Sequence, residues 1–305
     1  MYKVCVLMST YNGEKYIEEQ INTILGQIGV QIKLIIRDDG STDGTTKIIR
    51  KLMKNNDNIK LYTEKNIGCE SSFFKLLYEY VEDSDYYAFA DQDDSWEKNK
   101  LIASIECIKN KNQAMLVASN LKACNQYLEE LYEIHDESSF KLIEKNKKYN
   151  WLLNMHGCVL VWNKELQLLL KNYHPKYICA HDVWVCAVAN SIGKFDFIKE
   201  SYINYRLHDN NVSGFATSRY SRIKKAIKIY WGKNHPERNK IAQELLNGFE
   251  AYMDNEKEGY YNIVLLANYK KSFIKKIKLL TSTIFTGIPI FDKIFWQISI
   301  LMGMY

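Results

Sequence analysis

The stretch YKVCVLMSTYNGEKYIEEQINTILGQI, residues 2–28, contains one complete strand–turn–helix pattern. Its first part, Tyr2–Met8, is a short run rich in apolar residues, which is typical of a buried strand. A polar turn follows, and isoleucines then recur at helical spacing, at Ile17, Ile21, Ile24 and Ile28. The stretch therefore predicts a strand that leads through a tight turn into a helix.

The same pattern repeats over the first hundred residues. Three further strand-like runs are Gln31–Ile36, Ile59–Tyr62 and Tyr86–Ala90. Helical spacing lies between them, over residues 48–53 and 73–81. Alternation of strands and helices at this rhythm predicts an α/β fold with a mostly parallel sheet flanked by helices.

Beyond residue 114 the pattern is looser, and the segment 125–150 reads as polar and irregular. A helix is predicted to open at Asp182 and to end at Gly193, because the residues between them are almost all apolar. Four more strand-like runs accompany it: Ala114–Ala118, Cys158–Trp162, Phe195–Ile198 and Tyr202–Tyr205. We place the end of the catalytic domain at residue 215.

Composition separates the chain into two parts. Of its 305 residues, 47% are hydrophobic and 25% are charged, which is typical of a globular protein and excludes wholesale disorder. Residues 216–305 hold 15 Lys and Arg against 7 Asp and Glu, a net charge of +8, whereas residues 1–215 carry a net charge of −3. Seven cysteines without a C-x-x-C pair indicate a reducing compartment rather than a disulfide scaffold.

The basic part, residues 216–305, reads as helical and amphipathic. Lysines cluster within residues 270–305 beside strongly apolar stretches, and Asp292 and Lys293 divide the apolar part. Neither half reaches the roughly 20 residues that a membrane-spanning helix needs. The pattern predicts a segment that lies in the membrane interface. A helix packed on the body, with its lysines in solvent, is the alternative.

Three polar sites follow the predicted strands, and ligands of parallel sheets bind at the carboxyl ends of strands. The first is the turn STYNGE, which begins at Ser9. The second is RDDGSTDGT, with Asp38 and Asp39 directly after an apolar run. The third is ADQDDSW, which crowds three carboxylates within residues 91–94. Crowded carboxylates suit Mg²⁺ or Mn²⁺, although an acidic helix start has the same pattern. The chain has neither G-x-G-x-x-G nor a phosphate-binding P-loop.

The ordered set STYNGEKYIEEQI, RDDGSTDGT, NIGCESSFF and ADQDDSW resembles the bacterial family-2 glycosyltransferases over roughly residues 1–215. These are inverting enzymes of the GT-A fold that use nucleotide-diphospho-sugars. The DQDD form and the later segments HDVW and YRLHDNNVSG are most similar to the rhamnosyltransferase-like members. The resemblance implies a GT-A catalytic domain followed by a helical C-terminal extension.

The resemblance also implies roles for residues of this chain. Asp182 falls where the family has its catalytic base, and inverting transfer needs one base to take the proton of the acceptor hydroxyl. Asp91 and Asp93 match the D-x-D pair: Asp93 is expected to bind the metal, and Asp91 to contact ribose, or the metal through water. His208 is expected near the diphosphate and the metal, with Arg206 assisting. The expected donor-binding residues are Thr10, Tyr11, Glu14, Asp39, Asn66, Gly68, Asp91 and Arg206.

The leading hypothesis is therefore a metal-dependent transferase with Mg²⁺ or Mn²⁺ as cofactor, working at the cytoplasmic face of the cell membrane. It would move a sugar from dTDP-rhamnose or a UDP-hexose to a lipid-linked or oligosaccharide acceptor. Two alternatives remain from the sequence. A sugar nucleotidyltransferase shares the cofactor, but the STYNGEK turn lacks the glycines and basic residues that hold a triphosphate. A nucleic-acid binder would use the basic tail, whose apolar residues are aliphatic rather than the aromatic ones that stack on bases, so we expect no nucleic-acid partner.

Overall fold

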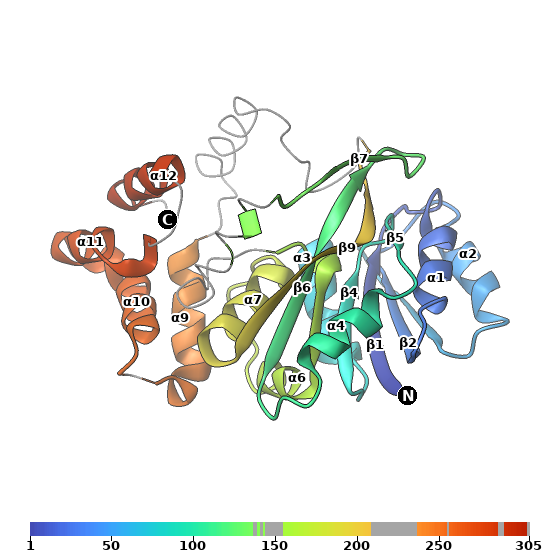
Figure 1. Cartoon of the computed structure of the whole chain (residues 1–305), viewed down its shortest axis with the longest axis horizontal. Coiled ribbons are helices and arrows are strands. Elements are labelled where there is room, and N and C mark those ends of the chain that lie inside the picture. The colour runs from blue at the N-terminus through green and yellow to red at the C-terminus, as the bar shows by residue number, and fades with distance from the viewer. Residues whose placement is uncertain are drawn as a thin grey trace.

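The computed structural model of the chain describes residues 1–136, 139–140, 143, 155–208, 237–254, 256–285 and 290–303. Figure 1 shows one curved sheet with helices on both faces and a group of C-terminal helices beside it. The basic segment 219–231 and the end of the YRLHDNNVSG motif, from residue 209, lie outside the described residues, as does most of 137–154.

The sheet runs in the order β3-β2-β1-β4-β8-β6-β9-β5, and β7 pairs with β6. Its strands are β1 (Tyr2–Thr10), β2 (Val30–Asp38), β3 (Ile59–Thr63), β4 (Tyr86–Ala90), β5 (Ser95–Trp96), β6 (Met115–Cys124), β7 (Glu130–Glu133), β8 (Leu160–Asn163) and β9 (Lys194–Arg206). The first four strands are parallel, as are β6 and β9, and β8 runs antiparallel between β4 and β6. The mainly parallel α/β sheet expected from the sequence is confirmed.

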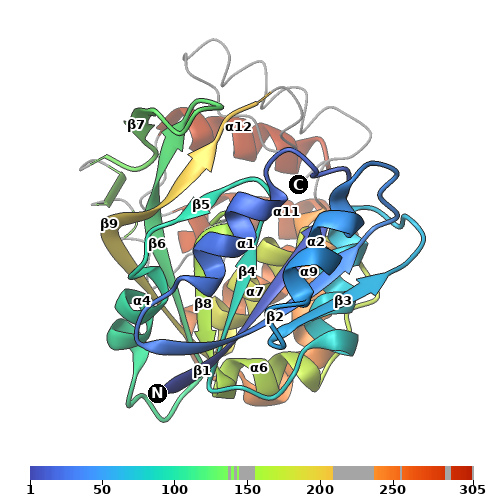
Figure 2. The ribbon, with the colours of Figure 1, turned by 90° about the vertical axis from the view of Figure 1, so that its right-hand side faces the viewer.

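Helices cover both faces of the sheet. The α-helices are α1 (Ile17–Leu25), α2 (Thr45–Met53), α3 (Cys69–Lys75), α4 (Lys100–Ile108), α6 (Lys164–Lys171), α7 (His181–Ile192), α9 (Arg238–Phe249), α10 (Glu258–Asn268), α11 (Phe273–Leu280) and α12 (Ile290–Leu301). Figure 2 shows α1 and α4 on the near face of the sheet and α7 on the far face. With helices on both sides, the central strands have no face left for water, so β4 is buried at all five positions.

Two local expectations were wrong. The two short strands predicted over residues 195–205 are one strand, β9, because β6 pairs along its length and a register shift accommodates the polar residues near 200. Ile28 lies beyond the end of α1, which stops before Gly26, and its side chain is exposed.

The described C-terminal helices pack on the body through α9. The Phe249 ring lies 6.1 Å from that of Trp184 on α7. The Glu244 carboxylate accepts hydrogen bonds from the Tyr173 hydroxyl and from the backbone N–H of Lys176. Because these groups are buried or partly buried, α9 shares the core of the sheet domain. Among the described residues, no helix combines the length and the apolar character that crossing a membrane requires.

Candidate active site

The three polar sites predicted from the sequence meet at one end of the sheet. The parallel strands β1, β2 and β4 all run toward this end, and the turns at residues 10–14, 38–45 and 91–94 follow them. In Figure 2 the turns after β1 and β2 lie side by side at the upper end of the molecule. The sheet therefore gathers polar groups that are more than 80 residues apart in the sequence.

Hydrogen bonds join the first two turns to each other. Asn12 has a left-handed backbone (φ 49°), and its side-chain oxygen accepts the N–H of Thr42 at 2.9 Å. The Glu14 carboxylate accepts the N–H of Gly44 at 2.6 Å. Glu14, predicted as a donor-binding residue, is thus a link between the two turns in this structure.

Gln92 holds the first turn from the other side, a role that no motif in the sequence indicated. Its side-chain oxygen accepts from the Thr10 hydroxyl (2.7 Å) and from the Tyr11 N–H (2.9 Å), and its amide donates to the Tyr11 carbonyl (3.1 Å). A Cβ at Gly13 would lie 2.3 Å from the same Gln92 oxygen. The Tyr11 side chain, by contrast, is 47% exposed and open to a ligand.

Asp39 is buried in an ion pair. Its carboxylate accepts from the Arg37 guanidinium at 2.6 Å and from the backbone N–H groups of Ile67 (2.8 Å) and Gly68 (2.9 Å). Gly68 has a φ of +87°, which side chains rarely allow, and its N–H also lies 3.2 Å from the Asn66 side-chain oxygen. The structure thus brings Asp39, Asn66 and Gly68 together, and Asp39 shapes the loop that holds the other two; their contact with a donor stays a prediction.

The carboxylates of the acidic turn after β4 belong to two separate groups of side chains. Asp93 and His208 meet, with 2.8 Å between the carboxylate and the ring Nε2. Asp91 and Asp94 instead lie with the Cys158 sulfur, all three ligand atoms within 4.8 Å of one another. Burial, then the negative charges of Asp93 and Asp182, raise the pKa of Asp91 to about 7. Adding a cation would relieve this crowding of charge.

The donor set fits a hard divalent cation at Asp93 better than at Cys158. Asp93 and His208 are both partly open to solvent, with side-chain exposures of 15% and 17%. Burial raises the pKa of Cys158 well above its usual range, so its sulfur stays a thiol, whereas metals bind the thiolate. Carboxylate oxygens are also the ligands that Mg²⁺ and Mn²⁺ prefer. Asp93 and His208 therefore suit the cation expected from the sequence, whereas Asp91 lies with Asp94 and Cys158 and stays a predicted metal ligand.

Arg206 anchors the acidic turn to the end of β9. Its guanidinium donates to the Asp93 carbonyl (2.9 Å), the Gln126 carbonyl (2.6 Å) and the Glu19 carboxylate (2.7 Å), and its backbone N–H donates to Asp94. The residue is only 2% exposed. In this structure Arg206 positions the acidic turn, and its contact with a donor phosphate stays a prediction.

Lys100 is a second residue of the site that the sequence analysis missed. It is fully buried at the start of α4, its Nζ lies 3.4 Å from the centre of the Trp96 ring, and burial lowers its pKa to about 7. Asp94 is equally buried, and burial raises the pKa of Asp94 well above its usual range. Among the described residues neither Lys100 Nζ nor Asp94 Oδ2 has a hydrogen-bond partner. The only feature of the sequence that could have indicated Lys100 is its position shortly after a D-x-D motif.

Asp182 lies in the first turn of α7, and its backbone neighbour Val183 donates to its carboxylate at 2.7 Å. Burial raises the pKa of Asp182 to about 6. Hydrogen bonds from the backbone of Val183 and Gly157 favour the charged form and lower this pKa, but burial has the larger effect. The charge of Asp182 also acts on Asp91, about ninety residues earlier in the chain. A carboxylate with a pKa near neutrality, whose charge is felt in the acidic turn, is suited to general-base catalysis.

His181 and Gly157 pack against each other next to Asp182. The His181 ring stacks on Phe73, with 3.8 Å between ring centres, and burial lowers its pKa to about 3, so it is neutral. A Cβ at Gly157 would lie 2.4 Å from His181 Nε2. Only a glycine therefore lets the chain come close enough to contact both His181 and Asp182.

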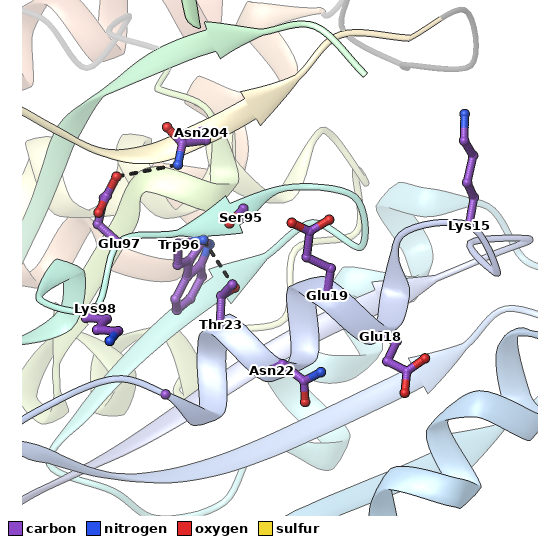
Figure 3. Close-up of a pocket in the computed structure, with 11 residues that line it drawn as sticks. Lys15, Glu18, Glu19, Asn22, Thr23, Ser95, Trp96, Glu97, Lys98 and Asn204 are labelled. Carbon is purple, nitrogen blue, oxygen red and sulfur yellow. Dashed lines mark hydrogen bonds between the residues drawn. The ribbon is translucent and has the colours of Figure 1, made fainter. Parts of the chain in front are cut away.

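A pocket of about 750 Å³ lies next to this site, between α1 and the β5–β9 pair (Figure 3), and its lining residues Glu19 and Trp96 contact Arg206 and Lys100. Figure 3 shows Glu18, Glu19 and Lys15 on the α1 side and Glu97 on the other. None of its lining residues is a predicted site residue. The pocket is lined by side chains of both charges. Because it contains none of the predicted site residues, the end of the sheet remains the candidate active site.

Comparisons with known proteins agree with this geometry. Residues 5–166 match the sequence profile of the family described as glycosyl transferase family 2. A dTDP-rhamnosyl transferase, RfbG, of Shigella flexneri is 28% identical over 289 residues, which cover 88% of this chain and 95% of that protein.

Two solved structures show the fold. TarS of S. aureus in complex with UDP-GlcNAc superimposes with a TM-score of 0.58 at 18% identity, covering 94% of this chain and 82% of that one. The mannosyltransferase PcManGT of Pyrobaculum calidifontis, in complex with GDP-Man and Mn²⁺, superimposes with a TM-score of 0.51 at 17% identity, covering 99% and 80%. These likenesses establish the GT-A fold.

Proposed function

The chain belongs to glycosyl transferase family 2 and is a glycosyltransferase, and on that premise we propose the donor, the acceptor and the catalytic residues. The donor is a nucleotide-diphospho-sugar, dTDP-rhamnose or a UDP-hexose. The acceptor is a hydroxyl of a lipid-linked glycan in the synthesis of a cell-surface polysaccharide. The rhamnosyl transferase similar over 88% of the chain supports the choice of dTDP-rhamnose.

The observation that carries the proposal is that the charge of Asp182 acts on Asp91 in the acidic turn and raises its pKa. Asp182 takes the proton of the acceptor hydroxyl, and the hydroxyl oxygen forms a bond to the anomeric carbon. The bond between that carbon and the diphosphate oxygen breaks at the same time, and the diphosphate leaves with its electron pair. Attack from the face opposite the leaving group inverts the configuration at the anomeric carbon.

The remaining residues hold the donor. Tyr11 is exposed beside the turn that Thr10 and Gln92 order, and its ring stacks on the nucleobase. Asp39 keeps one carboxylate oxygen with a single protein donor, and this oxygen accepts a hydrogen bond from the nucleoside. A divalent cation, Mg²⁺ or Mn²⁺, bound at Asp93 with Asp91 and His208 would neutralise the leaving diphosphate.

Calorimetric binding of UDP and dTDP, each with and without Mn²⁺, tests the donor proposal. We expect one nucleotide to bind and Mn²⁺ to tighten its binding. Binding of neither nucleotide would contradict the roles of Asp39 and Asp93. Transfer to a glycan acceptor, followed by the configuration of the new linkage, then tests the reaction. The domain boundary at residue 215 and the location at the inner face of the cell membrane stay predictions.

A further inference from the structure

Each of the two C-terminal helices α11 and α12 carries apolar side chains on two opposite faces, one buried and one exposed. On α11, Leu279 is fully buried, whereas Phe273 and Ile274 are 70% and 69% exposed. On α12, Ile300 is fully buried, whereas Ile290 is 69% exposed. One face of each helix therefore packs on the protein, and the other carries large apolar side chains into solvent.

The exposed apolar residues are arranged regularly. On α12 and just after it they recur at intervals of three or four positions, within an arc of about 120° around the helix. The two helices are joined, since Lys276 Nζ donates to the Leu301 carbonyl at 3.0 Å and the Gln297 amide donates to the Leu280 carbonyl at 3.3 Å. We name the exposed set the C-terminal apolar surface: Phe273, Ile274, Ile277, Ile290, Ile294, Ile298, Leu301 and Met302.

Basic residues border this surface. On the helical surface of α11, Lys278 lies beside the strip formed by Phe273, Ile274 and Ile277, and it is exposed. Lys275 lies next to Lys278 and is partly exposed. Lys270 and Lys271, both exposed, precede the helix, and α11 contains no acidic residue. An apolar strip bordered by lysines is complementary to a surface with acidic head groups above apolar chains.

The dimensions favour a helix that lies along such a surface. The 12 residues of α12 extend about 18 Å, against about 30 Å for the apolar core of a bilayer. Figures 1 and 2 share a vertical axis, and in both α12 lies toward the upper end, the end to which β1 and β2 run. A bilayer in contact with α12 would thus lie on the same upper side as the turns after β1 and β2, although Figure 1 shows α12 at the opposite end of the long axis from β1 and β2.

We propose that the C-terminal apolar surface docks this protein on the interface of an anionic phospholipid bilayer, with the lysines of α11 against the head groups. The apolar side chains enter the boundary between head groups and acyl chains, and the lysines select acidic lipids. This inference does not depend on the donor or on the catalytic residues proposed above.

Sedimentation of the full chain with vesicles tests the proposal. We expect binding to vesicles of phosphatidylcholine with phosphatidylglycerol, and much weaker binding to phosphatidylcholine alone. The double substitution Ile294→Ser/Ile298→Ser should weaken binding by about tenfold or more, since each half-exposed isoleucine loses much of its burial energy. Leu131→Ser/Leu168→Ser is the matched control, because both leucines are 53% exposed on the sheet domain, and it should bind as the unaltered protein does.

Lys275→Glu/Lys278→Glu should abolish the preference for phosphatidylglycerol while thermal unfolding stays unchanged. Three results would overturn the proposal. The unaltered protein remains in the supernatant with both kinds of vesicle; or the Ile294/Ile298 variant binds as tightly as the control; or sedimentation velocity detects a dimer that this variant loses, which would assign the surface to a second copy of the chain. Nucleotide binding by calorimetry, retained in the variants, separates these results from failure of the sugar-transfer proposal.

Discussion

Replacing Asp182 by Asn tests whether this residue is a catalytic base or only a polar residue in the first turn of α7. Asn has nearly the same shape as Asp, and its side-chain oxygen can still accept the Val183 N–H that now lies at 2.7 Å. Asn cannot take a proton from a hydroxyl. We therefore expect kcat to fall by about 10²- to 10⁴-fold, with nucleotide affinity nearly unchanged.

The same substitution should stabilise the fold at neutral pH. Burial raises the pKa of Asp182 from 3.8 to about 6, so the charged carboxylate is less favourable in the folded state than in the unfolded one. At about 1.4 kcal/mol per unit, the full shift amounts to about 3 kcal/mol. Since the side chain is only partly buried by surface area, we discount this to about 1–2 kcal/mol. The destabilisation is complete above pH 6 and disappears below pH 4, where both states are protonated.

The pKa also predicts the pH profile of the unaltered enzyme. With a pKa of about 6, roughly a tenth of the Asp182 carboxyl groups are ionised at pH 5, so kcat should be about tenfold lower there than at pH 7. With the ordinary pKa of 3.8, the rate would hardly change over this range.

The assays are sugar transfer at several pH values, urea unfolding at pH 7, and calorimetry of nucleotide binding. Glu165→Gln, in the first turn of α6, is the control for losing a carboxylate at a helix start. An Asp182→Asn variant that keeps its rate would refute the base assignment. One that loses nucleotide binding would move Asp182 into the donor pocket, and one that unfolds more easily at pH 7 would contradict the burial argument.

Three further predictions follow from individual contacts. Gly157→Ala places a Cβ 2.4 Å from His181 Nε2, so kcat should fall about tenfold with a loss of about 1–3 kcal/mol in urea unfolding; an unchanged kcat would separate this turn from the base. Asp93→Asn should remove the tightening of nucleotide binding by Mn²⁺ in calorimetry, and a retained Mn²⁺ effect would place the cation elsewhere. Asp39→Asn leaves the buried Arg37 guanidinium without its closest carboxylate and should cost about 3 kcal/mol in urea unfolding; an equally stable variant would show that Glu64 suffices.

Sequence patterns predicted the elements of the sheet well where a single periodicity dominated. Tyr86–Ala90 was located to the residue, because an uninterrupted apolar run bounded by polar residues suits a strand buried on both faces. The prediction was wrong where pairing overrode local composition. The polar residues in the middle of β9 belong to one strand because β6 pairs with β9 both before and after them, across a register shift.

The motifs by themselves determined the family, the α/β fold and the candidate residues, since short-range patterns encode strands, turns and the polar groups that follow them. Only the tertiary structure decided what those residues contact. Gln92, Lys100 and Gly157 have no distinctive local pattern, and their contacts join segments as much as 82 positions apart. Likewise, the pKa of Asp182 depends on what is packed around it. Burial and long-range contact are properties of the folded chain, because they arise only when distant segments exclude water from one another.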